Sequence, residues 1–222
     1  NIYGENYNLR ELRNQVGLVF QYPEHQLFEV NVLQDVCFGP KNQGLSPEEC
    51  EKRAREALQL VGLKEKYFDH SPFDLSGGQK RRAAIAGVLA MRPKVLVLDE
   101  PTAGMDAFAR RQMWNLLKKL NQQKLTILLT THYMEEAETL CDRVGFMCGG
   151  RLEETDAPGH MIETLGRYAV DETLPDGLKS HYFHGKEEAI QYLSASEQET
   201  ALRSTTLEDV FLETIGQQLE CR

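Results

Sequence analysis

The feature that most constrains this chain is a pair of segments that lie about one helix apart. The first is residues 74–82 (DLSGGQKRR), and the second is residues 94–101 (KVLVLDEP). A Ser-Gly-Gly turn that opens a helix offers free backbone N–H groups and the positive end of the helix dipole to phosphate oxygens. A buried strand that ends in adjacent acids can hold Mg²⁺ beside a group that orients attacking water. Together the two segments predict half of an ATPase site.

The loop that would complete such a site is not found in the sequence. The motif G-x-x-x-x-G-K-[ST], which cradles the α- and β-phosphates, does not occur in the 222 residues, and the first residue is Asn1 rather than Met. We therefore expect an N-terminally truncated chain. If the chain is complete as given, we expect weak ATP binding, because the loop and the lysine that anchor the nucleotide are missing.

Composition excludes several classes of protein. With 222 residues, of which 41% are hydrophobic, the chain can bury a full core. Its longest apolar stretch, residues 83–91, is far shorter than the roughly 20 residues that span a bilayer. The formal charge of −9 argues against a broad nucleic-acid surface. Five cysteines without a C-x-x-C pair indicate neither a zinc site nor a disulfide framework, and they favour a reducing cytosol.

Hydrophobic patterns predict an α/β core. Residues 16–20 form a β-prone run that leads into a polar loop. Residues 46–61 begin with Ser-Pro-Glu-Glu and predict a helix that stops at Gly62. Residues 95–98 and 126–130 are apolar strands without alternation, so we expect a parallel sheet with helices on both faces.

A shift in composition at residues 156–159 (DAPG) marks a domain boundary. We expect a core domain over residues 1–155 and a small α+β domain over residues 156–222. In the core, further helices are expected at residues 77–90, 109–122 and 134–140, with a hairpin at residues 143–152. In the C-terminal domain, short helices are expected at residues 161–165, 187–193 and 207–215, and β-prone segments at residues 168–170 and 180–183.

Four side chains at the ends of the predicted strands are candidates for chemistry. Asp99 and Glu100 follow a parallel strand, at the edge where open α/β sheets bind ligands. We assign Asp99 to Mg²⁺, through water, and Glu100 to polarising the hydrolytic water. His132 ends the next strand within reach of a γ-phosphate, and Gln21 follows the first strand, where we expect it to contact Mg²⁺ or the water.

A second group of candidates belongs to the Ser-Gly-Gly turn. We expect Ser76 to cap its helix, while Gly77 and Gly78 let the backbone approach a nucleotide without obstruction by a Cβ, with Gln79 beside them. Taken alone, this turn is an ordinary start of a helix, and its meaning comes from the acidic strand that follows. Asp106 either stabilises its own turn or reaches across a dimer, and the sequence leaves both possibilities open.

In combination these segments resemble the nucleotide-binding subunits of ABC transporters. Residues 75–79 are similar to the signature motif, residues 95–100 to Walker B and residues 103–106 to the D-loop, while His132 and Gln21 match the H-loop and the Q-loop. The resemblance covers about residues 9–155. It implies an α/β, P-loop NTPase-like ABC ATPase core that lacks Walker A, with a helical signature subdomain at about residues 40–92.

The same resemblance implies a function, cofactors and partners. It implies an ATP-hydrolysing subunit that uses ATP and Mg²⁺ and forms a head-to-tail dimer with a second ATP-binding subunit, identical or different. Each signature turn faces the ATP held by the other subunit. Transmembrane transporter subunits are the other implied partners, and nucleic acid is not one. The implied location is the cytoplasm, peripheral to the inner face of the cell membrane.

The resemblance differs between the two parts of the chain. Residues 9–130 are similar to the energy-coupling factor ATPases that drive cobalt and vitamin uptake. Residues 130–216, including 130–138 (TTHYMEEAE) and 206–212 (TLEDVFL), are similar to ATPases of ABC-2 type exporters. The direction of transport, import or export, therefore remains open. So does the origin of the divided resemblance, which a chimera and a divergent natural member would both explain.

Two alternatives to a transport ATPase follow from the residues. The chain can be a non-hydrolytic fragment that supplies only its signature face to a partner with its own P-loop. A soluble ABC ATPase of translation or repair is a minor candidate, because the charge is acidic and the Gln21 loop is importer-like.

Overall fold

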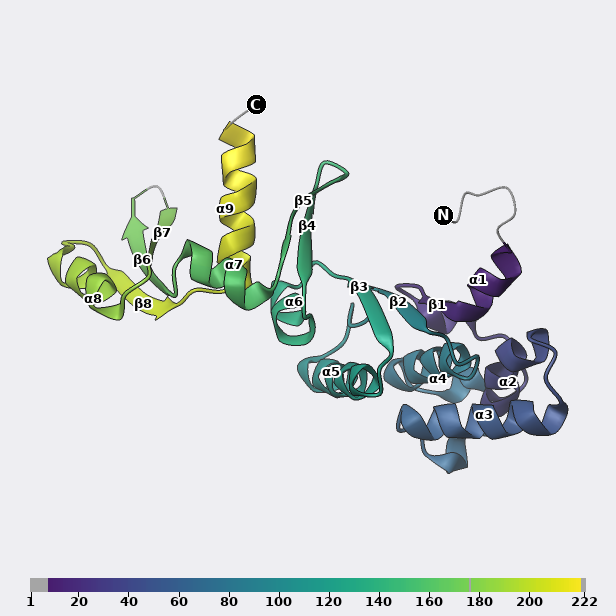
Figure 1. The fold of residues 1–222 in the computed structure, drawn as a ribbon. Helices are drawn as coiled ribbons and strands as arrows, with labels where there is room; N and C mark the ends of the chain where they lie inside the picture. Colours follow the sequence, from purple (N-terminus) through teal and green to yellow (C-terminus); the bar gives the residue numbers. More distant parts are fainter. Residues whose placement is uncertain (1–7, 176, 221–222) are drawn as a thin grey trace. The chain divides into compact units, whose positions relative to one another are not determined.

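The computed structural model describes residues 8–175 and 177–220, except the side chains of residue 215 and residues 217–220. The chain divides into two compact units, Asn1–His132 and Tyr133–Arg222, which are described separately (Figure 1). This division by contacts falls before the boundary expected after residue 155. Whether residues 133–155 belong functionally with the core therefore stays a prediction.

A parallel three-stranded sheet forms the centre of the N-terminal unit, in the order β1-β2-β3. Its strands are β1 (Val16–Val19), β2 (Val95–Asp99) and β3 (Thr126–Thr130). The register pairs Leu18 with Val97 and Val97 with Leu128, so all three strands end at one edge. The strands lie where the apolar runs predicted them.

The helices of this unit begin and end at residues with clear capping chemistry. In α3 (Pro47–Leu60), the Ser46 side chain accepts a hydrogen bond from the Glu49 N–H, and Gly62 with φ +73° follows the last turn. The other helices of the unit are α1 (Leu9–Gln15), α2 (Val32–Asn42), α4 (Gly77–Leu89) and α5 (Ala107–Gln122), with short 3₁₀ turns η1 (Pro23–Gln26), η2 (Glu65–Tyr67) and η3 (Pro72–Asp74).

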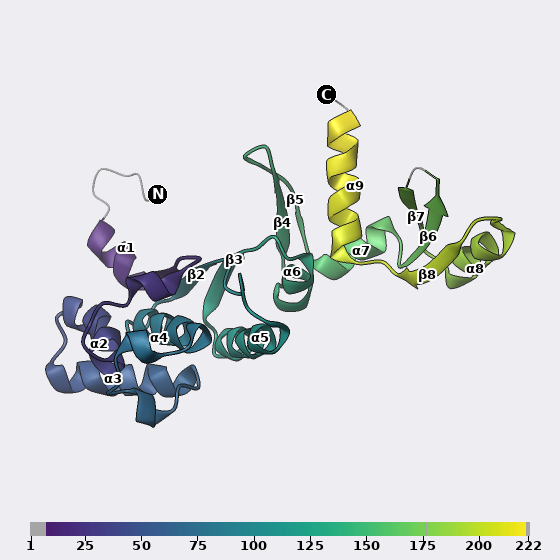
Figure 2. The same ribbon diagram turned by 180° about the vertical axis from the view of Figure 1, so that it is seen from behind.

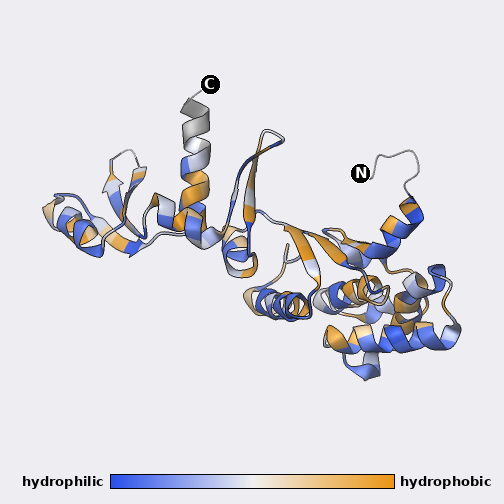
Figure 3. Cartoon of the chain, in the orientation of Figure 1, coloured by the Kyte–Doolittle hydropathy of each residue, from blue (hydrophilic) through white to orange (hydrophobic). Residues whose placement is uncertain are grey.

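The sheet is covered on one face within the described part of the unit, which corrects the expectation of helices on both faces. Helices α4 and α5 lie on the same side of the strands in both views (Figures 1 and 2). Leu96 and Leu98 face that side and are fully buried, whereas Leu18 is 44% and Leu128 is 59% exposed. The strands consist largely of apolar residues (Figure 3). The apolar pattern therefore predicted the sheet correctly but not the contacts of its second face.

The C-terminal unit contains a hairpin and a separate three-stranded antiparallel sheet of order β7-β6-β8. The hairpin joins β4 (Val144–Cys148) to β5 (Arg151–Asp156) through Gly149 and Gly150, which both have positive φ. The sheet strands are β6 (Tyr168–Leu174), β7 (Gly177–Phe183) and β8 (Thr200–Ser204), and the helices are α6 (Met134–Leu140), α7 (Pro158–Leu165), α8 (Lys186–Ala195) and α9 (Leu207–Glu220).

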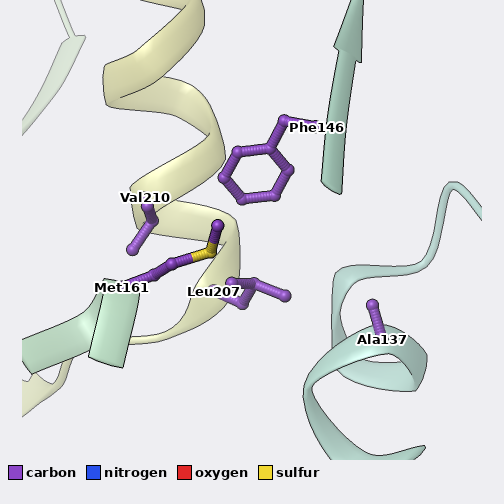
Figure 4. Close-up of a cluster of buried hydrophobic side chains, with 5 residues drawn as sticks. All are labelled: Ala137, Phe146, Met161, Leu207 and Val210. Carbon is purple, nitrogen blue, oxygen red and sulfur yellow. The ribbon is translucent and has the colours of Figure 1, made fainter. Parts of the chain in front are cut away.

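A small apolar core joins four elements of this unit. Ala137, Phe146, Met161, Leu207 and Val210 pack together from α6, β4, α7 and α9 (Figure 4). This shared core explains why α6 and the hairpin belong to the C-terminal unit by their contacts.

A partly buried ionic network attaches α9 to the neighbouring sheet. The Arg203 guanidinium donates hydrogen bonds to both carboxylates of the network, Asp171 and Asp209. Asp209 also accepts from the Thr206 N–H at 2.8 Å, which caps the start of α9. Burial would raise the pKa of Asp209, but the hydrogen bonds from Arg203 and Thr206 outweigh it and hold that pKa below its usual range.

Candidate functional site

Three predicted site residues meet at the carboxyl ends of the parallel strands. The Gln21 side chain, after β1, donates a hydrogen bond from Nε2 to Glu100 Oε2 at 2.6 Å. The other carboxylate oxygen of Glu100, Oε1, lies 3.0 Å from His132 Nδ1, after β3. The sheet order brings together residues that are 79 and 32 positions apart in the chain. Both carboxylate oxygens of Glu100 are therefore oriented by neighbours.

The backbone of Glu100 adopts a left-handed conformation. Its φ is +43°, which a side chain with a Cβ adopts only at an energetic cost of about 1–3 kcal/mol. Two backbone hydrogen bonds hold this conformation. The Glu100 N–H donates to Thr130 O at 2.9 Å, and the Ala103 N–H donates to Glu100 O at 3.1 Å. The strain turns Glu100 out of the strand direction and toward Gln21 and His132.

Asp99 lies at the same edge and is oriented separately. Its Oδ1 accepts a hydrogen bond from Thr130 Oγ1 at 2.5 Å. Sequence reasoning did not select Thr130, although its register pairing with Asp99 follows directly once β2 and β3 are aligned. The site therefore combines a hydroxyl, two carboxylates, an amide and an imidazole.

The second group of predicted residues lies at the start of α4. Ser76 is the N-cap residue, and its N–H donates to Gln79 Oε1 at 2.9 Å, which satisfies one of the free groups of the turn. At Gly77 and Gly78, an added Cβ would meet no heavy atom within 4 Å. The chain's own packing therefore does not require glycine at either position.

Asp106 performs the local role that the sequence left open. It is the N-cap residue of α5, and its Oδ1 accepts a hydrogen bond from the Ala109 N–H at 2.8 Å. A contact of Asp106 with nucleotide across a dimer stays a prediction.

Arg81 is a site residue that sequence reasoning missed. It lies in α4 with 4% of its surface exposed. Its Nη1 donates to Ala103 O at 2.9 Å, and its Nη2 donates to Gln21 O. The position within residues 80–82, a basic run on a predicted helix, indicated only a charged surface.

Two further facts concern metal binding and membrane spanning in residues 8–175 and 177–220. In this part of the chain, no three His, Cys, Asp or Glu side chains are arranged so that they alone could hold a metal ion. Within the same residues, no helix combines the length and the apolar content needed to cross a bilayer.

Comparison with known proteins assigns the family. Residues 2–103 match the family model described as ABC transporter. The energy-coupling factor transporter ATP-binding protein EcfA2 of Streptococcus pneumoniae is 52% identical over 161 residues, which cover 72% of this chain and 58% of that protein. Residues 2–103 belong to the ABC transporter family. The chain thus spans less than two thirds of the length of this curated relative.

Solved structures of ABC ATPases agree with the observed fold. The structure of cbiO1 from Clostridium perfringens, described as part of the ABC transporter complex cbiONQ, is 42% identical with a TM-score of 0.63. The match covers 67% of this chain and 59% of that one. An ATP-binding cassette solved as a dimer in a post-hydrolysis state, bound to ADP and Pi, is 32% identical with a TM-score of 0.58, over 67% of this chain and 66% of that one. The α/β ABC ATPase fold predicted from the motifs is confirmed.

The comparisons bear differently on the two predicted resemblances. The relatives confirm the similarity of this ABC domain to energy-coupling factor ATPases. The similarity of residues 130–216 to ABC-2 type exporter ATPases stays a prediction.

Proposed function

We propose that this chain forms the water-orienting side of an ATP-hydrolysing site in an ABC transporter subunit. The observation that carries the proposal is the Glu100 carboxylate, held between Gln21 and His132 at the ends of the parallel strands. Such a carboxylate accepts a proton from water, and neighbours that fix its two oxygens limit the directions from which water can approach.

The residues present fit Mg²⁺ together with a nucleotide phosphate. Asp99, Glu100 and the Gln21 amide provide the oxygen ligands that Mg²⁺ prefers. Mg²⁺ typically binds through one or two carboxylates, waters and substrate phosphates, which agrees with a site that no protein side chains complete by themselves among the described residues. When bound, ATP and Mg²⁺ supply the γ-phosphoryl group and the charge that stabilises its transfer.

Each site residue then has a defined part. Glu100 takes the position that polarises the attacking water, and His132 holds Glu100 Oε1 on one side. Gln21 holds Glu100 Oε2 through Nε2 and so keeps its own amide oxygen for the metal or the water. Asp99, oriented by the Thr130 hydroxyl, would hold Mg²⁺ through water. All four roles depend on hydrogen bonds made at one sheet edge.

The signature turn supports a second subunit as a partner. Glycine at two successive helical positions destabilises a helix, and nothing within 4 Å of Gly77 or Gly78 requires it. An outside ligand that must approach the backbone N–H groups explains the open space. We propose that this ligand is the ATP of a second ABC subunit, and the dimeric cassette structure supports the arrangement.

Transmembrane subunits are the other proposed partners, which places the chain at the cytoplasmic face of a membrane. The relatives are energy-coupling factor transporter ATP-binding proteins, which supports a transporter. The loop after β1 exposes Tyr22 and Phe28, which are 53% and 58% exposed. We propose this loop, together with α3, as the surface that contacts those subunits.

The test is ATP hydrolysis by the gene product that contains this chain, with Glu100→Gln compared against the parent. Loss of a general base lowers turnover by about 100-fold or more, while ATP-dependent association should persist. Glu163→Gln is the matched control, because Glu163, in α7, makes a surface ion pair with Arg167 and is part of neither the proposed site nor the proposed contact surface. Hydrolysis that survives Glu100→Gln would remove Glu100 from its proposed role.

The same assay separates the alternative of a non-hydrolytic fragment that supplies only its signature face to a partner with its own P-loop. In that case the gene product alone hydrolyses no ATP. It raises hydrolysis only when mixed with a P-loop-bearing partner, and Ser76→Arg abolishes that stimulation whereas Glu100→Gln does not.

A further inference from the structure

Arg81 connects the signature helix to the two loops that surround Glu100. It lies one turn after Gly77 in α4, and its guanidinium reaches two backbone carbonyls that are far apart in the chain. One carbonyl is that of Gln21, 60 positions away, and the other is that of Ala103, 22 positions away. A single buried side chain therefore bridges three segments.

Both carbonyls belong to residues that set the position of Glu100. Gln21 donates to Glu100 Oε2 at 2.6 Å, and the Ala103 N–H donates to Glu100 O at 3.1 Å. Arg81 thus restrains one residue that contacts the Glu100 side chain and one that contacts its backbone. A shift of α4 would reach both residues through Arg81.

The chemistry of the side chain fits this task better than that of other residues. Arg81 is only 4% exposed, and a buried charge costs free energy unless it is hydrogen-bonded. A guanidinium at this place therefore indicates that its hydrogen-bond geometry is required. The planar fork of arginine can reach two acceptors at fixed directions, whereas a lysine ammonium acts as a single point on a flexible stem. The conservative change Arg81→Lys therefore keeps the charge and removes the bridge.

We propose that Arg81 is a positioning residue that ties the signature helix to the Gln21 and Ala103 loops and so sets the Gln21–Glu100 contact. This inference deepens the proposed function and rests on it for its catalytic consequence. The mechanical part, the tie itself, is a property of the chain alone and can be tested without ATP.

Hydrogen exchange of the chain tests the tie directly. Three backbone amides report on the two loops: His25 donates to Tyr22 O, Ala103 to Glu100 O and Met105 to Thr102 O. Losing hydrogen bonds from a charged group should increase exchange of these amides by about tenfold in Arg81→Lys and Arg81→Gln. Amides of α3 should not change. Arg53→Gln is the matched control, because Arg53 makes an ion pair with Glu49 within α3.

The kinetic test uses the gene product that contains this chain. We expect Arg81→Lys to lower kcat for ATP hydrolysis by about tenfold and to leave KM within about twofold, since misplacement of the water-orienting group acts on turnover rather than on nucleotide anchoring. A merely structural role would lower the active fraction and the melting temperature without loop-specific exchange.

The outcomes are separable. Unchanged exchange in both loops, or variants that unfold α4 as a whole, would overturn the positioning role. Absence of hydrolysis in the parent protein would instead overturn the proposed function, and the exchange result would still decide whether the tie exists.

Discussion

Replacing both signature glycines with alanine should make the chain more stable and, at the same time, abolish the proposed ATP-dependent dimerisation. Stability should rise because alanine is accepted within the folded chain, whereas dimerisation should be lost because the added methyl groups would face the nucleotide. Gly77 and Gly78 lie in the first turn of α4, outside the positive-φ region, and an added Cβ meets no heavy atom within 4 Å. The folded chain accepts alanine there without strain.

The magnitude follows from the unfolded state. Alanine restricts the unfolded backbone more than glycine does, which stabilises a compatible site by about 0.4–1 kcal/mol. Adjacent helical residues point in different directions, so the two gains should nearly add to about 1–2 kcal/mol. In a chain of 222 residues, this free energy raises the melting temperature of the N-terminal unit by about 2–8 °C.

The assay pairs thermal unfolding with ATP-dependent dimerisation. Dimers would be trapped in the gene product that carries Glu100→Gln and measured by size-exclusion chromatography. The alanine methyl groups should block the approach of phosphate to the backbone N–H groups and prevent the dimer.

Two controls from the same region bracket the result. Gly87→Ala in α4 places its Cβ 4.0 Å from Val36 Cα, so a stability gain without loss of dimerisation is expected. Gly17→Ala places its Cβ 2.3 Å from Val88 Cγ1 and should destabilise the chain by about 1–3 kcal/mol. A destabilised Gly77→Ala/Gly78→Ala chain, or a stable one that still dimerises with ATP, would refute the reasoning.

Two further predictions concern stability. Asp106→Ala should cost about 1 kcal/mol by removing the N-cap of α5, whereas Asp106→Ser should restore most of it; urea unfolding measures both. Arg203 holds the pKa of Asp171 and Asp209 low against the effect of burial, so this stabilisation is complete above about pH 4, the unfolded carboxylate pKa, and is lost as the pH falls below it. Arg203→Met should reverse that pH dependence and lower the free energy of unfolding by about 2 kcal/mol near pH 7. The NMR signals of Val170 in urea report this unfolding. If the loss of stability below about pH 4 were the same in the variant, Arg203 would not be its cause.

Local chemistry explains which elements the sequence could predict. Helix α3 was predicted nearly to the residue because Ser46, Pro47 and Gly62 mark its ends. Helix α2 was not predicted, because it contains Pro40 and Gly39, which disfavour helix when considered alone; burial of Val32 and Val36 overrides that preference.

Contacts distant in sequence account for the parts of the site that were missed. Gln21, Glu100 and His132 could be selected because each follows a predicted strand. Thr130 and Arg81 could not, since their roles depend on partners 31 and 60 positions away and on the alignment of elements that no local pattern specifies. The apolar strands, likewise, predicted a parallel sheet but not which of its faces the chain itself covers.

The site combines three locally unfavourable features, of which the first is the backbone of Glu100. Among the described residues other than glycine, positive φ occurs at Arg92, Glu100 and Lys124. Arg92 and Lys124 follow the ends of α4 and α5, where a left-handed residue terminates a helix. Glu100 has no such explanation, because it follows a strand.

The same region also contains two glycines that local packing does not require and a buried guanidinium that bridges backbone carbonyls. Natural sequences tend to violate local rules where function requires it. In the proposed arrangement, Arg81 connects the strained Glu100 to the open start of α4. The physical cost is then concentrated along the path by which a ligand at the α4 N-terminus would influence Glu100.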